Sequence, residues 1–526
     1  MDTETNAVQK PSERRKKPVW LWILLGVLIA GIAAAAVWFF CLREKPAEET
    51  ENAQEETVHE ETAQEETAEE SPVVLTVGDS RVEACEFNYF YHAIADNFVY
   101  NPQNAQMFGI QKDVPLYKQK LNANSNLGFL PYVGLSADCI KDLTPAEDGT
   151  YEVTWAELFA ENAMHNAAVS YAVCQEAEKA GFRLSNERAA EIDKIMDMVC
   201  ATAKQSNVSL NSYLEMVYGR GCNEKNYRQF LVISETAQAY PETLEFTDAD
   251  RTAELEKEPE KFETAAFCFY SVSASDLKAE AGPETDCDAQ AKAEAEKMAA
   301  DFDVNDRRAA IYGDRSRAAL SGNSGSVRMN DEAVSWLFDE AREGDVKMFT
   351  VPPETEDGEN TYIVLKMLSR GNYKTSNFLQ ITINKDSEYD KPAEGEKTAV
   401  EKVEAIKTSL EADPSEENFR KNAAEYMSYV HGDGTAENMS HSAMSGYGFE
   451  FYTWAGMESR KPGDWKMFEH DGTTEFFFYL GEGEDQQKLA LDAELRREWY
   501  TEISEAAVRS AGMDWAAVRE NCIPDF

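Results

Sequence analysis

The second half of this 526-residue chain contains one motif twice. Residues 341–349 read AREGDVKMF, and residues 459–468 read SRKPGDWKMF. A tryptophan lies one short helical stretch upstream of each copy, Trp336 and Trp454. Matches of this length at corresponding places are the signature of an internal repeat. We therefore expect two copies of one small folding unit in this half of the chain.

Each copy of the motif is flanked by segments with the residue pattern of strands. Residues 265–272 and 377–383 precede the copies, and residues 362–368 and 476–480 follow them after a turn. These runs are rich in aromatic and β-branched residues, as strands are, and helical patterns fill the gaps between them. The Gly-Asp step inside each motif is typical of a turn, so we interpret its aspartate as structural and not as catalytic.

Residues 19–42 carry no charged side chain, and about 20 apolar residues suffice to span a bilayer as a helix. Aromatic residues lie near both ends of this stretch, as at two membrane–water interfaces, and the basic residues 14–17 precede it. The positive-inside rule keeps that basic side cytoplasmic. We expect a single-pass anchor in the cell membrane, with the bulk of the chain outside. A cleaved signal peptide is the alternative, but the apolar run is longer than is typical of one.

The tract that follows the anchor is acidic and has almost no large apolar residue. Its pentapeptide AQEET occurs at 53–57 and again at 63–67. Such a tract cannot bury a core, so residues 43–72 are expected to be a disordered linker. The whole chain has 97 acidic and 51 basic side chains and a formal net charge of −46. That charge would repel phosphates, so we exclude nucleic acid as a partner.

The segment 73–255 has the pattern of a helical domain. A short strand is expected at its start, followed by an aromatic-rich helix at 86–100. A long helix is expected to begin at Trp155 and to end near Gly181. Serine and asparagine side chains can cap the next three helices, namely Ser185, Ser209 and Asn223. Helices of this length are marginal alone and must pack together.

This order of elements resembles a known family. The run VGDSRV at 77–82, followed by EFNY at 86–89, is similar to the N-terminal chaperone region of the parvulin-type extracytoplasmic foldases, the PrsA and SurA class. The runs WAELF at 155–159 and YGRGCNEKNY at 218–227 resemble later landmarks of those proteins. The resemblance covers about 73–250. The two repeated units are similar to the parvulin fold, a small sheet wrapped by helices, and a bacterial origin and a cell-envelope location are implied by this resemblance alone.

In the active members of that family, a proline pocket is flanked by histidines on the first and last strands of the sheet. The first strands of this chain read FCF at 267–269 and LQI at 379–381, and the last strands read TYIV at 361–364 and EFFF at 475–478. None of these contains the histidine of the family. The chain therefore lacks the side chains on which the resemblance would base peptidyl-prolyl isomerase activity.

The histidines of the second unit, His431, His441 and His470, fall outside those strand positions. Cys268 is the one candidate for a catalytic side chain, as a partial substitute for the histidine of the family. A strand cysteine between two phenylalanines is, however, typical of a small buried hydrophobe. His92, inside the aromatic-rich helix at 86–100, is expected to pack in the core.

We expect no cofactor and no metal. Residues 301–305 begin like a calcium loop, but Asp306 and Tyr312 stand where that loop needs glycine and glutamate. The sequence has no phosphate-binding loop and no nucleophile elbow. The nine cysteines include no C-x-x-C pair, so they indicate either buried thiols or an unoxidising habitat.

The sequence thus predicts an α+β protein that is a membrane-anchored extracytoplasmic chaperone or foldase. It would capture unfolded exported polypeptides in apolar hollows lined with aromatic and Met side chains, without strong isomerase activity. The first alternative is an active peptidyl-prolyl cis–trans isomerase, and the second is an envelope scaffold or docking protein. The expected parts are a cytoplasmic tail (1–18), a transmembrane helix (19–42), an acidic linker (43–72), a helical SurA-like chaperone domain (73–255), two parvulin-like units (256–372 and 373–487) and a C-terminal helix that packs on the N-terminal domain (488–526).

Overall fold

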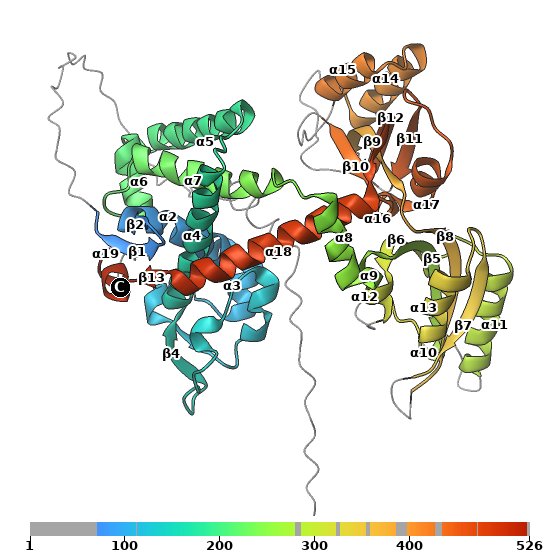
Figure 1. The fold of residues 1–526 in the computed structure, drawn as a ribbon, viewed down its shortest axis with the longest axis horizontal. Coiled ribbons are helices and arrows are strands. Elements are labelled where there is room, and N and C mark those ends of the chain that lie inside the picture. Colours follow the sequence, from blue (N-terminus) through green and yellow to red (C-terminus); the bar gives the residue numbers. More distant parts are fainter. Residues whose placement is uncertain are drawn as a thin grey trace, which may run out of the picture. The chain divides into compact units, whose positions relative to one another are not determined.

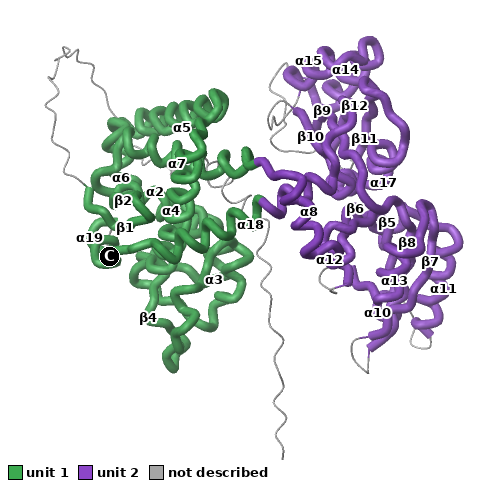
Figure 2. Tube along the Cα trace, viewed as in Figure 1, with its two compact units in different colours: residues 1–244, 496–526 green, residues 245–495 purple. Residues whose placement is uncertain are grey.

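The computed structural model combines helices and strands, which confirms the α+β class. It divides into two compact units of residues, 1–244 with 496–526 (unit 1) and 245–495 (unit 2) (Figure 2). The expected cytoplasmic tail, transmembrane helix and all but the end of the acidic linker lie outside the described residues. Among the helices described, none combines the length and the apolar character that a membrane crossing requires. The described residues are 71–111, 113–278, 286–321, 327–353, 358–384, 397–426, 434–470 and 472–522.

Unit 1 is mainly helical, and side chains at the helix starts explain where its helices begin. Thr154 and Glu157 form a capping box at the start of the long helix α4. Ser185, Ser209 and Asn223 each accept a backbone N–H at the start of the next three helices, as the sequence predicts. The main elements of unit 1 are β1 (Val73–Val77), β2 (Ser80–Glu83), α2 (Ala84–Tyr100), α3 (Pro102–Phe108), β3 (Lys120–Asn122), β4 (Thr150–Thr154), α4 (Trp155–Lys179), α5 (Asn186–Gln205), α6 (Leu210–Tyr218) and α7 (Glu224–Glu242).

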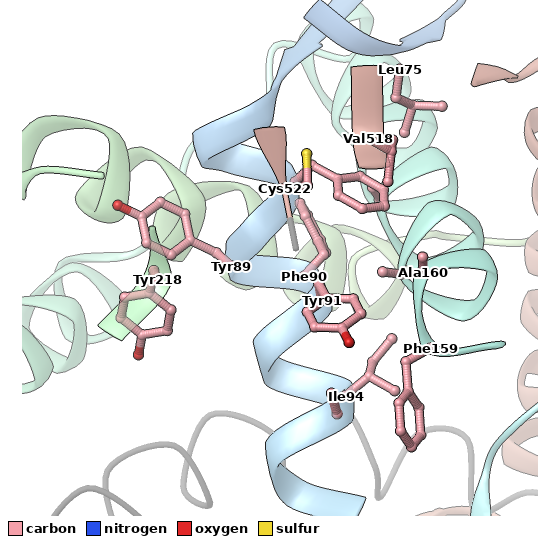
Figure 3. Packing of buried hydrophobic residues seen from close by; sticks show 14 of the residues in the cluster. Leu75, Tyr89, Phe90, Tyr91, Ile94, Phe159, Ala160, Tyr218, Val518 and Cys522 are labelled. Atoms are coloured by element: carbon pink, nitrogen blue, oxygen red, sulfur yellow. The ribbon is translucent and has the colours of Figure 1, made fainter. Parts of the chain in front are cut away.

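The C-terminal segment completes unit 1 but is not the single helix that the sequence predicts. The helix α18 (Gln486–Ser510) ends early, and the short strand β13 (Gly512–Met513) and the helix α19 (Trp515–Asn521) follow it. Strand β13 pairs antiparallel with β1. Val518 and Cys522 are buried in the same apolar cluster as α2 and α4, and Figure 3 shows them beside the side chains of that core. Both ends of the described chain therefore contribute to one core.

Unit 2 contains two four-stranded sheets with the same strand order, as the repeated motif predicts. The first sheet has the order β6-β5-β8-β7 and the second β10-β9-β12-β11, with all neighbours antiparallel. Helices precede and follow the strands in both halves (Figure 1). The strands are β5 (Thr264–Ser273), β6 (Ala309–Ser316), β7 (Val346–Val351), β8 (Thr361–Arg370), β9 (Lys374–Asn384), β10 (Thr435–Met439), β11 (Trp465–His470) and β12 (Thr473–Asp485).

The helices of unit 2 include one short π-helical stretch in each half, directly before the repeated motif. They are α8 (Asp248–Lys257), α9 (Pro259–Phe262), α10 (Ala274–Lys278), α11 (Cys287–Ala300), α12 (Arg317–Ser321), α13 (Asp331–Ser335), the π-helix Trp336–Glu340, α14 (Ala399–Ala412), α15 (Glu416–Tyr426), α16 (His441–Ser445), α17 (Gly448–Tyr452) and the π-helix Thr453–Met457.

The two Gly-Asp steps of the repeated motif make the same turn. Gly344 and Gly463 have φ angles of 84° and 100°, which favour glycine. Each aspartate closes its turn: Asp345 accepts the Arg342 N–H at 2.9 Å, and Asp464 accepts the corresponding N–H of Lys461 at 2.8 Å. The two carboxylates therefore have a structural role, because each accepts a backbone N–H within its own turn.

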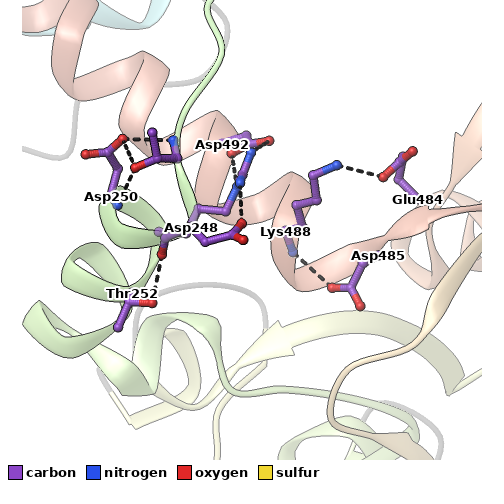
Figure 4. A network of polar contacts seen from close by, with 9 residues as sticks. Asp248, Asp250, Thr252, Glu484, Asp485, Lys488 and Asp492 are labelled. Atoms are coloured by element: carbon purple, nitrogen blue, oxygen red, sulfur yellow. Dashed lines mark hydrogen bonds and ion pairs between the residues drawn. The ribbon is translucent and has the colours of Figure 1, made fainter.

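The border between the units lies earlier than the sequence suggests, because residues 245–255 belong to unit 2. Within unit 2, an ion-pair network joins α8 to the N-terminal part of α18 (Figure 4). The Arg251 guanidinium donates to both carboxylate oxygens of Asp492, at 2.6 and 3.1 Å. A bidentate pair of this kind fixes geometry as well as charge.

Candidate functional site

The faces of the two sheets in unit 2 are covered by the chain's own apolar side chains. On the second sheet Phe378 and Phe477 are fully buried, and so is Phe451 of α17, whose ring centroid is 4.2 Å from that of Phe477. In the first sheet Phe267 and Leu365 are likewise fully buried. The opposite face of each sheet is covered by a second apolar cluster, which buries Val272 in the first sheet and Ile381 in the second. The apolar hollows expected for client binding are therefore not on these sheet faces.

Cys268 lies in this packed interior. Its side chain belongs to the cluster that also holds Ala266 and Leu368, and only 2% of the residue is exposed. Burial raises the pKa of the Cys268 thiol to about 12, against which the nearby Lys366 acts weakly. Since the thiolate and not the thiol is the nucleophile, this group is inert at neutral pH. The structure supports its interpretation as a small core hydrophobe.

The structure places His441 in a buried polar cluster. His431 lies outside the described residues, and the side chain of His470 does as well. His92 is partly buried in unit 1, with Nδ1 3.2 Å from Asp96 Oδ2 and its ring edge-on to Tyr218. His92 therefore packs as the sequence predicts.

The cluster around His441 joins the two halves of unit 2. The His441 ring stacks on Tyr373 with centroids 3.6 Å apart and planes 5° apart. Its Nδ1 lies 3.1 Å from Ser369 Oγ on β8. The Tyr373 hydroxyl donates to the Asp314 carboxylate on β6 and accepts the His441 backbone N–H at 2.6 Å. We name these residues, with Tyr452, the His441 cluster.

The His441 cluster is not a Ser-His-Asp catalytic triad. In a triad the carboxylate holds the second ring nitrogen of the histidine. Here the Asp314 carboxylate is taken up by the Tyr373 hydroxyl at 3.0 Å and by the Ser442 N–H at 2.8 Å. His441 is also only 7% exposed. The arrangement fixes α16 against β6 and leaves no access for a substrate.

A close backbone contact explains how α16 can approach β6 so closely. A Cβ atom at Gly313 would lie 2.2 Å from the backbone carbon and oxygen of His441, so only glycine fits there. The next residue, Asp314, has a φ angle of 49°, a conformation that aspartate tolerates better than most residues. Sequence reasoning missed this contact, because a Gly-Asp step gives no indication of a partner far away in the chain.

Exposed apolar side chains are concentrated on unit 1. Among the described residues, eight of the ten exposed large hydrophobic residues lie in unit 1 and two in unit 2. Tyr132 is the most exposed of them, at 76%, and the neighbouring Phe129 is 55% exposed. The eight are Tyr100, Met107, Phe129, Tyr132, Leu143, Met198, Val208 and Met216, and the two are Val400 and Met457.

The short 3₁₀ helix Leu127–Val133 explains why two aromatic rings face outward. In a 3₁₀ helix, side chains three residues apart lie on the same side. Leu127 and Leu130 are buried in the core of unit 1, so Phe129 and Tyr132 share the opposite side. Their ring centroids are 5.8 Å apart. We name the surface formed by Phe129 and Tyr132 the aromatic patch.

The segment that carries the aromatic patch is held in place by local bonds. The Asn126 side-chain amide donates to the backbone oxygen of Met107 at 2.8 Å, which ties the segment to α3. Met107 is itself 38% exposed. The outward position of the two rings is thus part of a defined local structure.

No protein-family model, curated protein or solved structure matches this chain.

Proposed function

We propose that this chain is a membrane-anchored extracytoplasmic protein that binds unfolded exported polypeptides through unit 1. The observation that carries the proposal is the contrast between the units. Unit 1 exposes aromatic and Met side chains, whereas the sheets of unit 2 bury theirs. Adjoining exposed apolar side chains on a protein surface are typical of interaction sites. The simplest class of partner for this surface is an extended polypeptide that contains some apolar side chains.

Capture would be reversible and weakly selective. Aromatic rings supply contact area at low entropic cost, and the unbranched Met side chain adapts to many shapes. The net charge of −46 suppresses self-association and favours basic clients. Nothing in this mechanism needs a covalent step.

The relation to parvulin-type foldases also remains a proposal. It is supported by the repeated strand order and by the helices around each sheet. The filled sheet faces and the buried Cys268 favour units that have kept the fold without a proline pocket. Catalysis of isomerisation would need a pocket that desolvates and twists the X–Pro bond.

The full-length protein in detergent is expected to slow the aggregation of several unrelated, chemically unfolded proteins. The double variant Phe129→Ser with Tyr132→Ser should lose about half or more of this effect, because it removes the two adjoining exposed aromatic rings of unit 1. Light scattering measures the result. Circular dichroism should show unchanged folding, since both side chains are exposed.

The matched control is Val400→Ser, which removes an apolar side chain that is 64% exposed on α14 of unit 2. Its effect should be small. Equal losses in the control and the double variant would contradict the proposal. Protection of a single envelope protein alone would support the scaffold alternative instead. Acceleration of X–Pro isomerisation in a protease-coupled assay, abolished by Cys268→Ala, would support the isomerase.

The proposed anchor has its own test. When membranes carrying the chain are washed with alkaline carbonate, the chain should stay in the pellet, because a spanning helix resists extraction. Deletion of residues 19–42 should release it into the soluble fraction. Release of the intact-length chain by the wash, or a mature N-terminus beyond residue 42, would contradict the single-pass anchor.

A further inference from the structure

Unit 2 has an apolar cleft beside its first sheet. The cleft has a volume of about 420 Å³, within the size range of ligand sites. Its apolar part comes from the helices α8 and α9, through Leu255, Pro259 and Phe262. The remaining lining comes from Glu260, Glu263, Arg317, Gly371, Asn372 and Gln487. The chain segments that meet here are far apart in sequence but belong to one compact unit.

The charge of the cleft is negative, because its one cation is already paired. The Arg317 guanidinium donates to Glu263 at 2.7 Å and also pairs with Asp339. Glu260 is exposed, and no ion pair of its carboxylate occurs among the residues that the structure describes. A positively charged group entering the cleft would therefore find Glu260 available.

The cleft also offers an uncommitted amide. Both polar atoms of the Asn372 side chain are engaged, since it donates to Asp485 at 2.6 Å and accepts the Gln487 backbone N–H at 3.0 Å. Within the described part of the chain, the side-chain amide of Gln487 makes no hydrogen bond. An amide of this kind can both donate to and accept from a peptide backbone.

We infer that this cleft binds a short extended peptide segment in which an apolar residue adjoins Lys or Arg. The apolar side chain would lie on Leu255, Pro259 and Phe262, the cation against Glu260, and the backbone against Gln487. The inference rests on the proposed function, because it names the class of polypeptide that the protein would hold. It places a second contact site on unit 2, separate from the aromatic patch.

The test uses the full-length protein in detergent and a labelled peptide with Leu-Lys pairs in a Gly/Ser background. Fluorescence anisotropy should show saturable binding. Glu260→Lys should weaken binding about fivefold or more, and Leu255→Asp about tenfold. A tenfold change corresponds to about 1.4 kcal/mol. Replacing Lys by Glu, or Leu by Ser, in the peptide should weaken its binding to the natural protein at least as much as the corresponding protein variant does.

The matched control for Glu260→Lys is Glu256→Lys, on the preceding helix α8, which changes the net charge identically but does not line the cleft. It should change the affinity less than about twofold, as expected for a screened surface charge. Equal effects of Glu256→Lys and Glu260→Lys, or no effect of either, would overturn the inference.

The outcome separates this inference from the proposed function. If the peptide binds, and only the variant that removes Phe129 and Tyr132 weakens it, the cleft is not a site while binding by unit 1 stands. If the cleft variants weaken peptide binding but aggregation of unfolded proteins is not slowed, the cleft stands and the proposed function falls. A photoactivatable group on the peptide should cross-link to residues 255–263.

Discussion

Replacing Phe477 by alanine is expected to destabilise unit 2 by about 3–5 kcal/mol. Phe477 is fully buried on β12 and belongs to the apolar cluster on one face of the second sheet. Its ring centroid lies 4.2 Å from that of Phe451 and 5.1 Å from that of Tyr447. Truncation removes these contacts and leaves a cavity that the close-packed neighbouring rings can fill only in part.

Urea unfolding followed by circular dichroism measures the effect. The control is Val400→Ala on α14, where the exposed side chain should change the stability by about 0.5 kcal/mol or less. A loss below about 1 kcal/mol for Phe477→Ala would mean that the sheet face is loosely packed. That result would restore the face as a possible binding hollow and weaken the assignment of binding to unit 1.

The local elements of this protein could be predicted because they depend on nearby residues. Ser185, Ser209 and Asn223 cap helices through bonds to residues two or three positions away. The two Gly-Asp turns likewise close locally, through a hydrogen bond from a backbone N–H to the aspartate carboxylate three residues later. Alternation of apolar residues, together with a repeated motif, was enough to indicate two similar sheets.

The features that prediction missed all depend on contacts between distant segments. Arg251, in the segment 245–255 of unit 2, pairs with Asp492, which lies far along the chain. The His441 cluster needs a glycine on β6 and a histidine on α16 to meet. Whether a sheet face is open or filled depends on where the aromatic residues of helices come to lie. The side chain of Phe451 packs on the second sheet and fills one of its faces. The periodicity of apolar residues in the sequence does not reveal this contact.

Acidification is expected to weaken unit 2 through His441. Burial lowers the pKa of His441 to about 4, from an ordinary value of 6.5. The Asp314 carboxylate on β6 acts in the opposite direction, and Arg460 adds to the lowering. The other neighbours of the His441 ring are uncharged: Tyr373 stacks on it, Tyr452 packs against it, and Ser369 is hydrogen-bonded to it.

The direction of the effect follows from the lowered pKa. The unfolded chain takes up a proton near pH 6.5, whereas the folded chain resists it until about pH 4. The contribution of His441 is therefore complete above pH 6.5 and falls as the pH decreases toward 4. At about 1.4 kcal/mol for each unit of pKa, the loss over this whole range is roughly 3–4 kcal/mol.

The variant His441→Phe isolates this effect from the titration of carboxylates elsewhere. Phenylalanine keeps a flat ring against Tyr373 but cannot take up a proton. The difference in unfolding free energy between the natural protein and the variant should favour the natural protein at about pH 7, where its bond to Ser369 is intact. It should shrink or reverse at about pH 4.5. A difference that stays constant between these two pH values would mean that His441 is solvated in the folded protein, and the close stacking that joins the two halves of unit 2 would have to be given up.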